Sequence, residues 1–130
     1  MPARHVAAAA VALATLGSLG ACSKDPATST AQTYTVKAGD KSCDVEQTTF
    51  APGPITFSVD NTASDVTEVY VYGKSGDSFT EVIEEAEDIG PGTSRDLTVD
   101  LDAGSYRLTC KPGMVGSGIS VPIVVRDNPS

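Results

Sequence analysis

Residues 102–114 read DAGSYRLTCKPGM, and this stretch decides the fold. Its first five residues have the spacing of a tyrosine corner, in which a tyrosine hydroxyl bonds back across a connection of a Greek-key sandwich. Tyr106, Leu108 and Cys110 alternate with polar residues, so their side chains share one face of a strand. Cys110 is therefore expected near the end of that strand, at the rim of the sandwich, just before a tight loop that contains Met114.

The rest of the sequence shows the same period-two alternation of apolar and polar residues, interrupted by turn-forming Gly, Pro, Asp and Asn. This pattern predicts an all-β protein, a Greek-key antiparallel β-sandwich. Pro122 falls inside the last expected strand and predicts an edge or a bulge there. The acidic stretch EVIEEAEDIG, residues 81–90, is long enough for a helical turn at most. The expected strands lie near residues 34–36, 55–59, 68–72, 79–83, 97–101, 106–110 and 119–125.

The first residues are expected to be a lipoprotein signal peptide. Arg4 precedes an apolar run that is too short to span a bilayer, and the run ends in LGAC at residues 19–22. This ending is typical of bacterial lipoproteins, which are cleaved before the cysteine and lipidated on it; the alternative is a plain secretory signal with an incidental cysteine. The lipid would anchor the protein to the cell membrane, facing the extracytoplasmic or periplasmic side. The predicted organisation is a signal peptide at 1–21, lipidated Cys22 with a flexible tether at 22–32, and one domain at 33–130.

Charge and histidine content exclude several classes of function. Removing residues 1–21 removes one of nine basic residues and none of 17 acidic ones, so the mature net charge is 8 − 17 = −9. Such a surface repels nucleic acid and anionic headgroups and favours cations or basic proteins. The only histidine, His5, leaves with the signal peptide. Catalysis by a His-activated nucleophile and a blue-copper site with two histidines and a cysteine are therefore excluded.

Two thiols remain after lipidation of Cys22, those of Cys43 and Cys110. An oxidising compartment and an even count favour a disulfide, which would leave a metal-free interaction module braced by that bond. The alternative is a soft-metal site at the rim, built from two thiolates, a carboxylate and the thioether of Met114. Spacing and compartment alone favour the disulfide.

A resemblance changes that balance. TEVYVYG at residues 67–73, IGPGTSRDLTVDL at 89–101 and CKPGMVGSGI at 110–119 resemble the EfeO-type cupredoxin-like domain of periplasmic iron-uptake proteins. Cupredoxins usually carry a histidine between the Cys and the Met of this loop, whereas the EfeO-type loop lacks it, as this sequence does. The resemblance covers most of residues 33–126 and implies a metal site. The ligands that it implies are Cys43, Glu68, Cys110 and Met114.

The resemblance also implies a cofactor and partners. Copper is the expected metal, with iron as the other candidate, and the expected role lies in iron uptake or electron relay. The implied partners are an iron-uptake permease or an imelysin-like protein. Larger members carry a helical imelysin-like domain, which this chain is expected to lack. Enzymatic activity would be limited to a metal-linked oxidation of ferrous iron, because the sequence offers no nucleophile–base pair for hydrolytic catalysis.

Two further groups of residues carry weaker signals. Tyr70 and Tyr72 alternate within one expected strand, and so share a face that they pack or cap. A cluster of carboxylates follows them in the sequence. It is either a solvated face or a secondary patch for a hard cation, because carboxylate oxygens suit such ions. The cluster consists of Glu81, Glu84, Glu85, Glu87 and Asp88.

Overall fold

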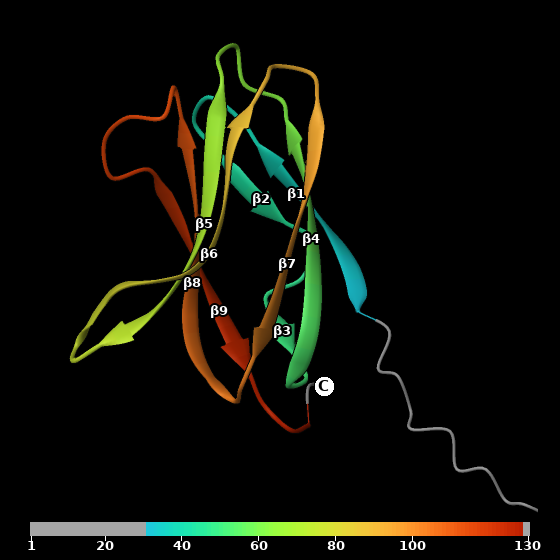
Figure 1. Cartoon of the computed structure of the whole chain (residues 1–130), viewed down its shortest axis with the longest axis vertical. Coiled ribbons are helices and arrows are strands. Elements are labelled where there is room, and N and C mark those ends of the chain that lie inside the picture. Colours follow the sequence, from blue (N-terminus) through green and yellow to red (C-terminus); the bar gives the residue numbers. More distant parts are fainter. Residues whose placement is uncertain (1–30, 129–130) are drawn as a thin grey trace, which may run out of the picture.

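The computed structural model describes residues 31–128 and forms a two-layered β-sandwich (Figure 1). One sheet has four strands in the order β2-β1-β4-β7, and the other has five in the order β3-β9-β8-β5-β6. The predicted signal peptide, Cys22 and most of the predicted tether lie outside the described residues. The strands are β1 (Gln32–Ala38), β2 (Cys43–Val45), β3 (Thr49–Phe50), β4 (Gly53–Asn61), β5 (Thr67–Ser75), β6 (Ser78–Ile89), β7 (Ser94–Leu101), β8 (Gly104–Pro112) and β9 (Ile119–Val125).

The predicted sandwich is confirmed, but two of its strand pairs are parallel. β1 runs parallel to β4, and β3 runs parallel to β9, while the other pairs are antiparallel. Parallel neighbours require a crossover between them. Here the chain leaves the four-stranded sheet after β2, adds β3 to the other sheet, and returns as β4. The alternation of apolar and polar residues along one strand does not indicate whether its neighbour runs parallel or antiparallel to it.

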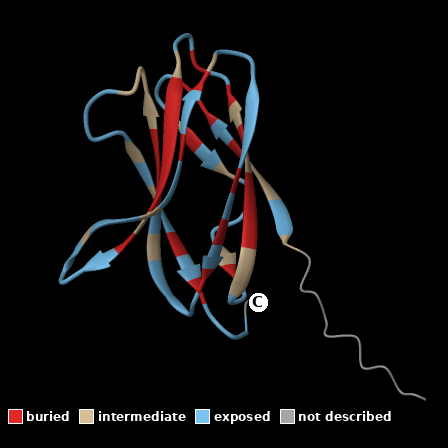
Figure 2. Ribbon diagram, viewed as in Figure 1, coloured by how far each residue is buried: buried red, intermediate tan, exposed pale blue. Residues whose placement is uncertain are grey.

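The core lies between the two sheets, where the inward-facing apolar residues of both sheets meet (Figure 2). Val36, Phe57, Val59, Val71 and Leu108 are completely buried. The hydrophobic burial of such residues is the main force that holds the layers together, at about 1.5–3 kcal/mol for each fully buried large side chain. None of the residues in 31–128 forms a helix long and apolar enough to cross a bilayer.

The structure tests three local predictions, all of them in the five-stranded sheet. The Tyr106 hydroxyl donates to the carbonyl oxygen of Asp102 at 2.8 Å, so the tyrosine corner is confirmed. β9 pairs with β3 only at Val124 and Val125, which leaves the stretch around Pro122 at the edge, as expected. The suggested helical turn in residues 81–90 is wrong. This stretch is part of β6, which pairs with β5 through bulges that absorb its irregular spacing.

Candidate functional site

The two cysteines within the described residues, Cys43 and Cys110, are joined in the structure. Cys43 begins β2 and Cys110 lies near the end of β8, so their disulfide ties one sheet to the other. Their Cα atoms are 5.6 Å apart, and Cys110 is completely buried while Cys43 is 7% exposed. While this bond is intact, neither sulfur is a thiolate, and neither can act as a metal ligand of the thiolate kind.

Glu68 lies on the opposite side of the five-stranded sheet from the disulfide. Its neighbour Val69 pairs with Cys110 and points into the core, and successive residues of a strand face opposite sides. The Glu68 carboxylate lies 3.5 Å from the ammonium of Lys111, its cross-strand partner. The structure therefore brings Cys43 and Cys110 together but does not bring Glu68 to them.

Met114 lies in the loop that follows Cys110, at the same end of the sandwich as the disulfide. Its backbone N–H donates to the carbonyl of Lys111 at 3.0 Å, and that of Gly113 donates to Val66 at 2.7 Å. Both residues have positive φ, 71° for Gly113 and 56° for Met114. A positive φ is uncommon for a residue other than glycine, so Met114 adopts an unusual backbone conformation in this loop. Met114 is half-buried.

The outer face around Glu68 forms a compact polar and aromatic arrangement. The Lys111 ammonium lies 4.4 Å from the ring centre of Tyr70, and Tyr70 stacks on Tyr72 at 5.3 Å. The Tyr70 hydroxyl donates to Glu87 at 3.3 Å. Burial, followed by the nearby carboxylate of Glu68, raises the pKa of Tyr70 well above its usual range. Tyr70 is therefore a neutral hydrogen-bond donor at physiological pH.

The acidic residues suggested as a hard-cation patch are all exposed and follow one another along β6. Within residues 31–128, no three His, Cys, Asp or Glu side chains are arranged to hold a metal ion. Glu87 is occupied with Tyr70, and its backbone carbonyl accepts a hydrogen bond from Arg95 at 2.6 Å. The structure spreads this cluster along a solvated strand. It comprises Glu81, Glu84, Glu85, Glu87 and Asp88.

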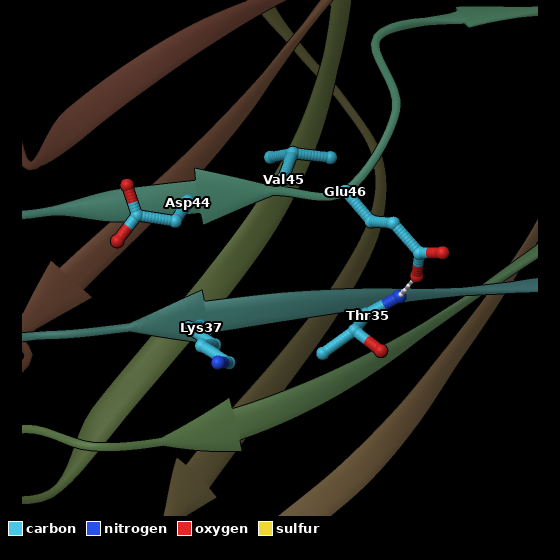
Figure 3. Close-up of a pocket in the computed structure, with 5 residues that line it drawn as sticks. All are labelled: Thr35, Lys37, Asp44, Val45 and Glu46. Carbon is cyan, nitrogen blue, oxygen red and sulfur yellow. Dashed lines mark hydrogen bonds between the residues drawn. The ribbon is translucent and has the colours of Figure 1, made fainter.

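A cavity of about 450 Å³ lies against β1 and β2 (Figure 3). Lys37, Asp44 and Glu46 contribute charges of both signs to its lining. The Glu46 carboxylate already accepts the backbone N–H of Thr35 at 2.8 Å, as the dashed line in Figure 3 shows. The lining carries one basic and two acidic side chains, and one of these carboxylates is already hydrogen-bonded to the backbone, so the cavity does not indicate a class of ligand.

Sequence reasoning missed the role of Asn61, which it interpreted only as part of a turn. Asn61 is 2% exposed, and its amide donates to the carbonyls of Asp65 and Ile89 at 2.9 and 2.8 Å. Its side-chain oxygen accepts the N–H of Ala63 at 2.8 Å. Asn61 thus organises the connection that leads into β5 and Glu68. An asparagine at the end of a strand was the available signal, but its partners come from distant residues.

We expect Lys111→Met to lower the free energy of unfolding by about 2 kcal/mol, because Glu68 is then left buried without a cation. The Glu68 side chain is 8% exposed, so water does not replace the lost partner. Chemical denaturation at neutral pH measures the change, and the double variant Glu68→Gln/Lys111→Met should recover most of it. Lys37→Met, which alters an exposed lysine, is the control. Equal losses in the single and double variants would contradict a coupled pair.

Comparison with protein families gives a match to the cupredoxin-like domain over residues 8–125. The chain belongs to this family. Solved structures with the same fold include dithionite-reduced auracyanin from Roseiflexus castenholzii, with a TM-score of 0.57 and 18% identity over 74% of this chain and 98% of that one. An azurin from Methylomonas sp. strain J has a TM-score of 0.53 and 13% identity over 75% and 99%.

Auracyanin A from Chloroflexus aurantiacus, described as a "blue" copper protein, reaches a TM-score of 0.46 at 16% identity over 72% and 99% of the two chains. That score adds nothing to the fold assignment. Among curated protein sequences, none matches this chain significantly. At these identities the structural likeness establishes the fold alone, a cupredoxin-like β-sandwich.

The donor atoms of this cupredoxin-like domain can be tested against copper. Residues 31–128 contain no histidine, so the domain does not fit a copper ion held by two imidazoles and one thiolate. The donors that suit a soft copper ion are the sulfur atoms of Cys43, Cys110 and Met114. The first two become donors only when their disulfide is reduced. The residues present therefore fit a copper ion that is held by sulfur ligands in the reduced protein.

Proposed function

We propose that this protein is an extracytoplasmic cupredoxin-like lipoprotein that binds copper in its reduced state. The sulfur atoms of Cys43, Cys110 and Met114 would hold the ion, and the disulfide form would be the metal-free state. Bound copper would supply a one-electron couple at the end of the sandwich. Glu68 is left out of this ligand set because it faces the other side of the sheet and pairs with Lys111.

The observation that carries the proposal is the grouping of sulfur. The described residues contain three sulfur-bearing side chains, and all three lie at the end of the sandwich where β2 begins and β8 ends. Two of them are already within bonding distance. Reduction breaks the S–S bond and consumes two electrons and two protons, which an external dithiol supplies while it is itself oxidised to a disulfide. Thiolates and thioethers are soft ligands that suit Cu(I).

The proposed place of this copper site is an EfeO-type iron-uptake system, in which ferrous iron is the substrate. The support is the resemblance of the CKPGM loop and its flanking stretches to that domain. A lipid on Cys22 would hold the protein at the outer surface of the membrane, near a permease or a separate imelysin-like protein. Co-purification of either partner with the membrane-tethered chain, and its loss in Cys22→Ala, would test this placement.

Copper binding is tested by titrating Cu⁺ anaerobically into the purified chain before and after reduction by a dithiol, with bicinchoninate as competitor. We expect no copper in the disulfide form and one per chain, with two protected thiols, in the reduced form. Cys110→Ser should abolish binding, and Met114→Leu, which conserves volume, should weaken it about tenfold. Two free thiols without bound copper would exclude the proposal.

A second function is favoured by the burial of the disulfide itself. A bond that is 0–7% exposed and joins two sheets is placed to brace the fold. In this alternative the protein is a metal-free interaction module that presents its loops to a partner. Resistance of the disulfide to the dithiol under native conditions would support the brace and set aside the copper site.

A further inference from the structure

The outer face of the five-stranded sheet carries a groove that is separate from the buried disulfide. Two projections frame this face, the hairpin between β5 and β6 and the loop between β8 and β9, and both extend from the same side of the molecule (Figure 1). The groove between them has a volume of about 360 Å³, within the size range of small-molecule sites. Its lining includes Phe79 and Thr80 from the hairpin side and Gly116 and Ser117 from the loop.

The floor of the groove is built from outward-facing residues of β8. Arg107, Thr109 and Lys111 alternate with the buried Leu108 and Cys110, so strand parity places all three on this face. The groove is basic although the chain is strongly acidic. Its lining contains two basic residues, Arg107 and Lys111, and no acidic one. A third cation, the ammonium of Lys74, lies 5.4 Å from the ring centre of Phe79, which also lines the groove.

These cations are not equivalent. Lys111 is held by the Glu68 carboxylate at 3.5 Å, the sole ion pair found within residues 31–128, so its charge is compensated. Arg107 is exposed, and its guanidinium carbon lies 4.6 Å from the ring centre of Phe79. Stacking fixes the plane of a guanidinium but leaves its N–H donors at the edge free. The guanidinium of Arg107 is therefore held in place with its edge N–H donors free. It has no carboxylate partner among the described residues.

The remaining lining adds hydroxyl groups that can meet a ligand with hydroxyls of its own. Thr109 and Ser120 are hydrogen-bonded to each other at 2.8 Å across β8 and β9, and Ser117 lies on the loop side. Tyr72 closes the inner wall. A planar carboxylate matches the fork of Arg107 in a bidentate arrangement, and adjacent hydroxyls match the serine and threonine oxygens.

We propose that this groove binds a small hydroxycarboxylate, with its carboxylate on Arg107 and its hydroxyl groups toward Thr109, Ser117 and Ser120. The ligand is small because the groove is short. It is anionic because the uncompensated charge of the lining is positive. This site does not depend on copper or on reduction of the disulfide, since its lining residues face away from the core.

The test is isothermal titration of the purified chain, in its disulfide form without copper, with L-tartrate. We expect one tartrate per chain and no binding of threitol, the neutral polyol with the same carbon skeleton. Inorganic phosphate can also bind the guanidinium fork, but it lacks the carbon-borne hydroxyl groups that reach Thr109, Ser117 and Ser120, so it should bind about tenfold more weakly. Equal binding of threitol or phosphate, or no binding of tartrate, would overturn the proposal.

Variants locate the site. Arg107→Gln should weaken tartrate binding about tenfold or more, and Arg107→Lys, which keeps the charge but loses the fork, should weaken it about fivefold. Arg126→Gln removes the same charge at an exposed position after β9 and should leave the affinity unchanged. Thermal unfolding of all three variants confirms that the fold is retained. If Arg107→Gln and Arg126→Gln weakened binding equally, the binding would depend on the overall charge of the protein and not on this groove, and the proposed site would be rejected.

Discussion

Replacing both Cys43 and Cys110 by alanine should lower the free energy of unfolding by roughly 4 kcal/mol. The disulfide closes a loop with a sequence separation of 67 residues, and on the chain-entropy model it restricts the unfolded chain by about that amount. For a domain of this size the loss corresponds to a decrease in melting temperature of roughly 15–30 °C. Both side chains lie in the core, so the folded state also loses contacts.

The effect is measured by chemical denaturation of the oxidised parent, the parent after reduction, and the double alanine variant. The reduced parent serves as the control, because it has the same side chains without the cross-link. It should lie close to the double variant if the cross-link dominates. A loss below about 1 kcal/mol in both would show that the bond does not brace the sandwich.

The second large effect is expected for Asn61→Ala, at about 3 kcal/mol. The substitution removes the hydrogen bonds that Asn61 donates to the carbonyls of Asp65 and Ile89, in a site that is 2% exposed. It also removes one of the two acceptors of the Ala63 N–H, which keeps its bond to the Ala38 carbonyl at 3.1 Å. Each buried polar group that loses its partner costs about 1–3 kcal/mol, and partial relaxation of the connection reduces the sum.

Urea denaturation of Asn61→Ala against the parent gives the change in the free energy of unfolding. Asn128→Ala, at an exposed position near the end of the described chain, is the matched control and should change stability by less than about 0.5 kcal/mol. Hydrogen exchange of the Ala63 amide adds a local measurement, and we expect its protection to decrease, because only the bond to the Ala38 carbonyl remains. Equal stability of the two variants would show that Asn61 does not anchor this connection.

The sequence predicted the sandwich because local patterns suffice for it. The alternation in residues 97–101 and 106–110 follows from the pleat of a strand with one buried face, and the tyrosine corner depends on a bond between residues four apart. The same reasoning failed for β6, because its bulges interrupt the alternation of apolar and polar residues. A helical turn in residues 81–90 therefore remained an alternative.

The candidate site was predictable only in part. Cys43 and Cys110 stood out as the thiols that remain if Cys22 is lipidated, and strand parity put Cys110 on the same face as Tyr106 and Leu108, at the rim. The structure buries Cys110 completely. Glu68 was grouped with them by resemblance. The register of β5 and β8 instead pairs Glu68 with Lys111 on the outer face, one residue away from Val69 and Cys110. A shift of one position along a strand reverses the face, so the resemblance of a motif does not determine which side chains meet.

By itself the sequence determined the fold class, the absence of histidine from residues 31–128, and the set of sulfur atoms in that range. These follow from composition and from patterns between near neighbours. Only the tertiary structure decided that β1 and β4 run parallel, that Glu68 faces Lys111, and that Arg107 and Phe79 meet across a groove. Each of these depends on which strands become neighbours and in which register. That choice is made by the packing of the whole core, not by any single segment.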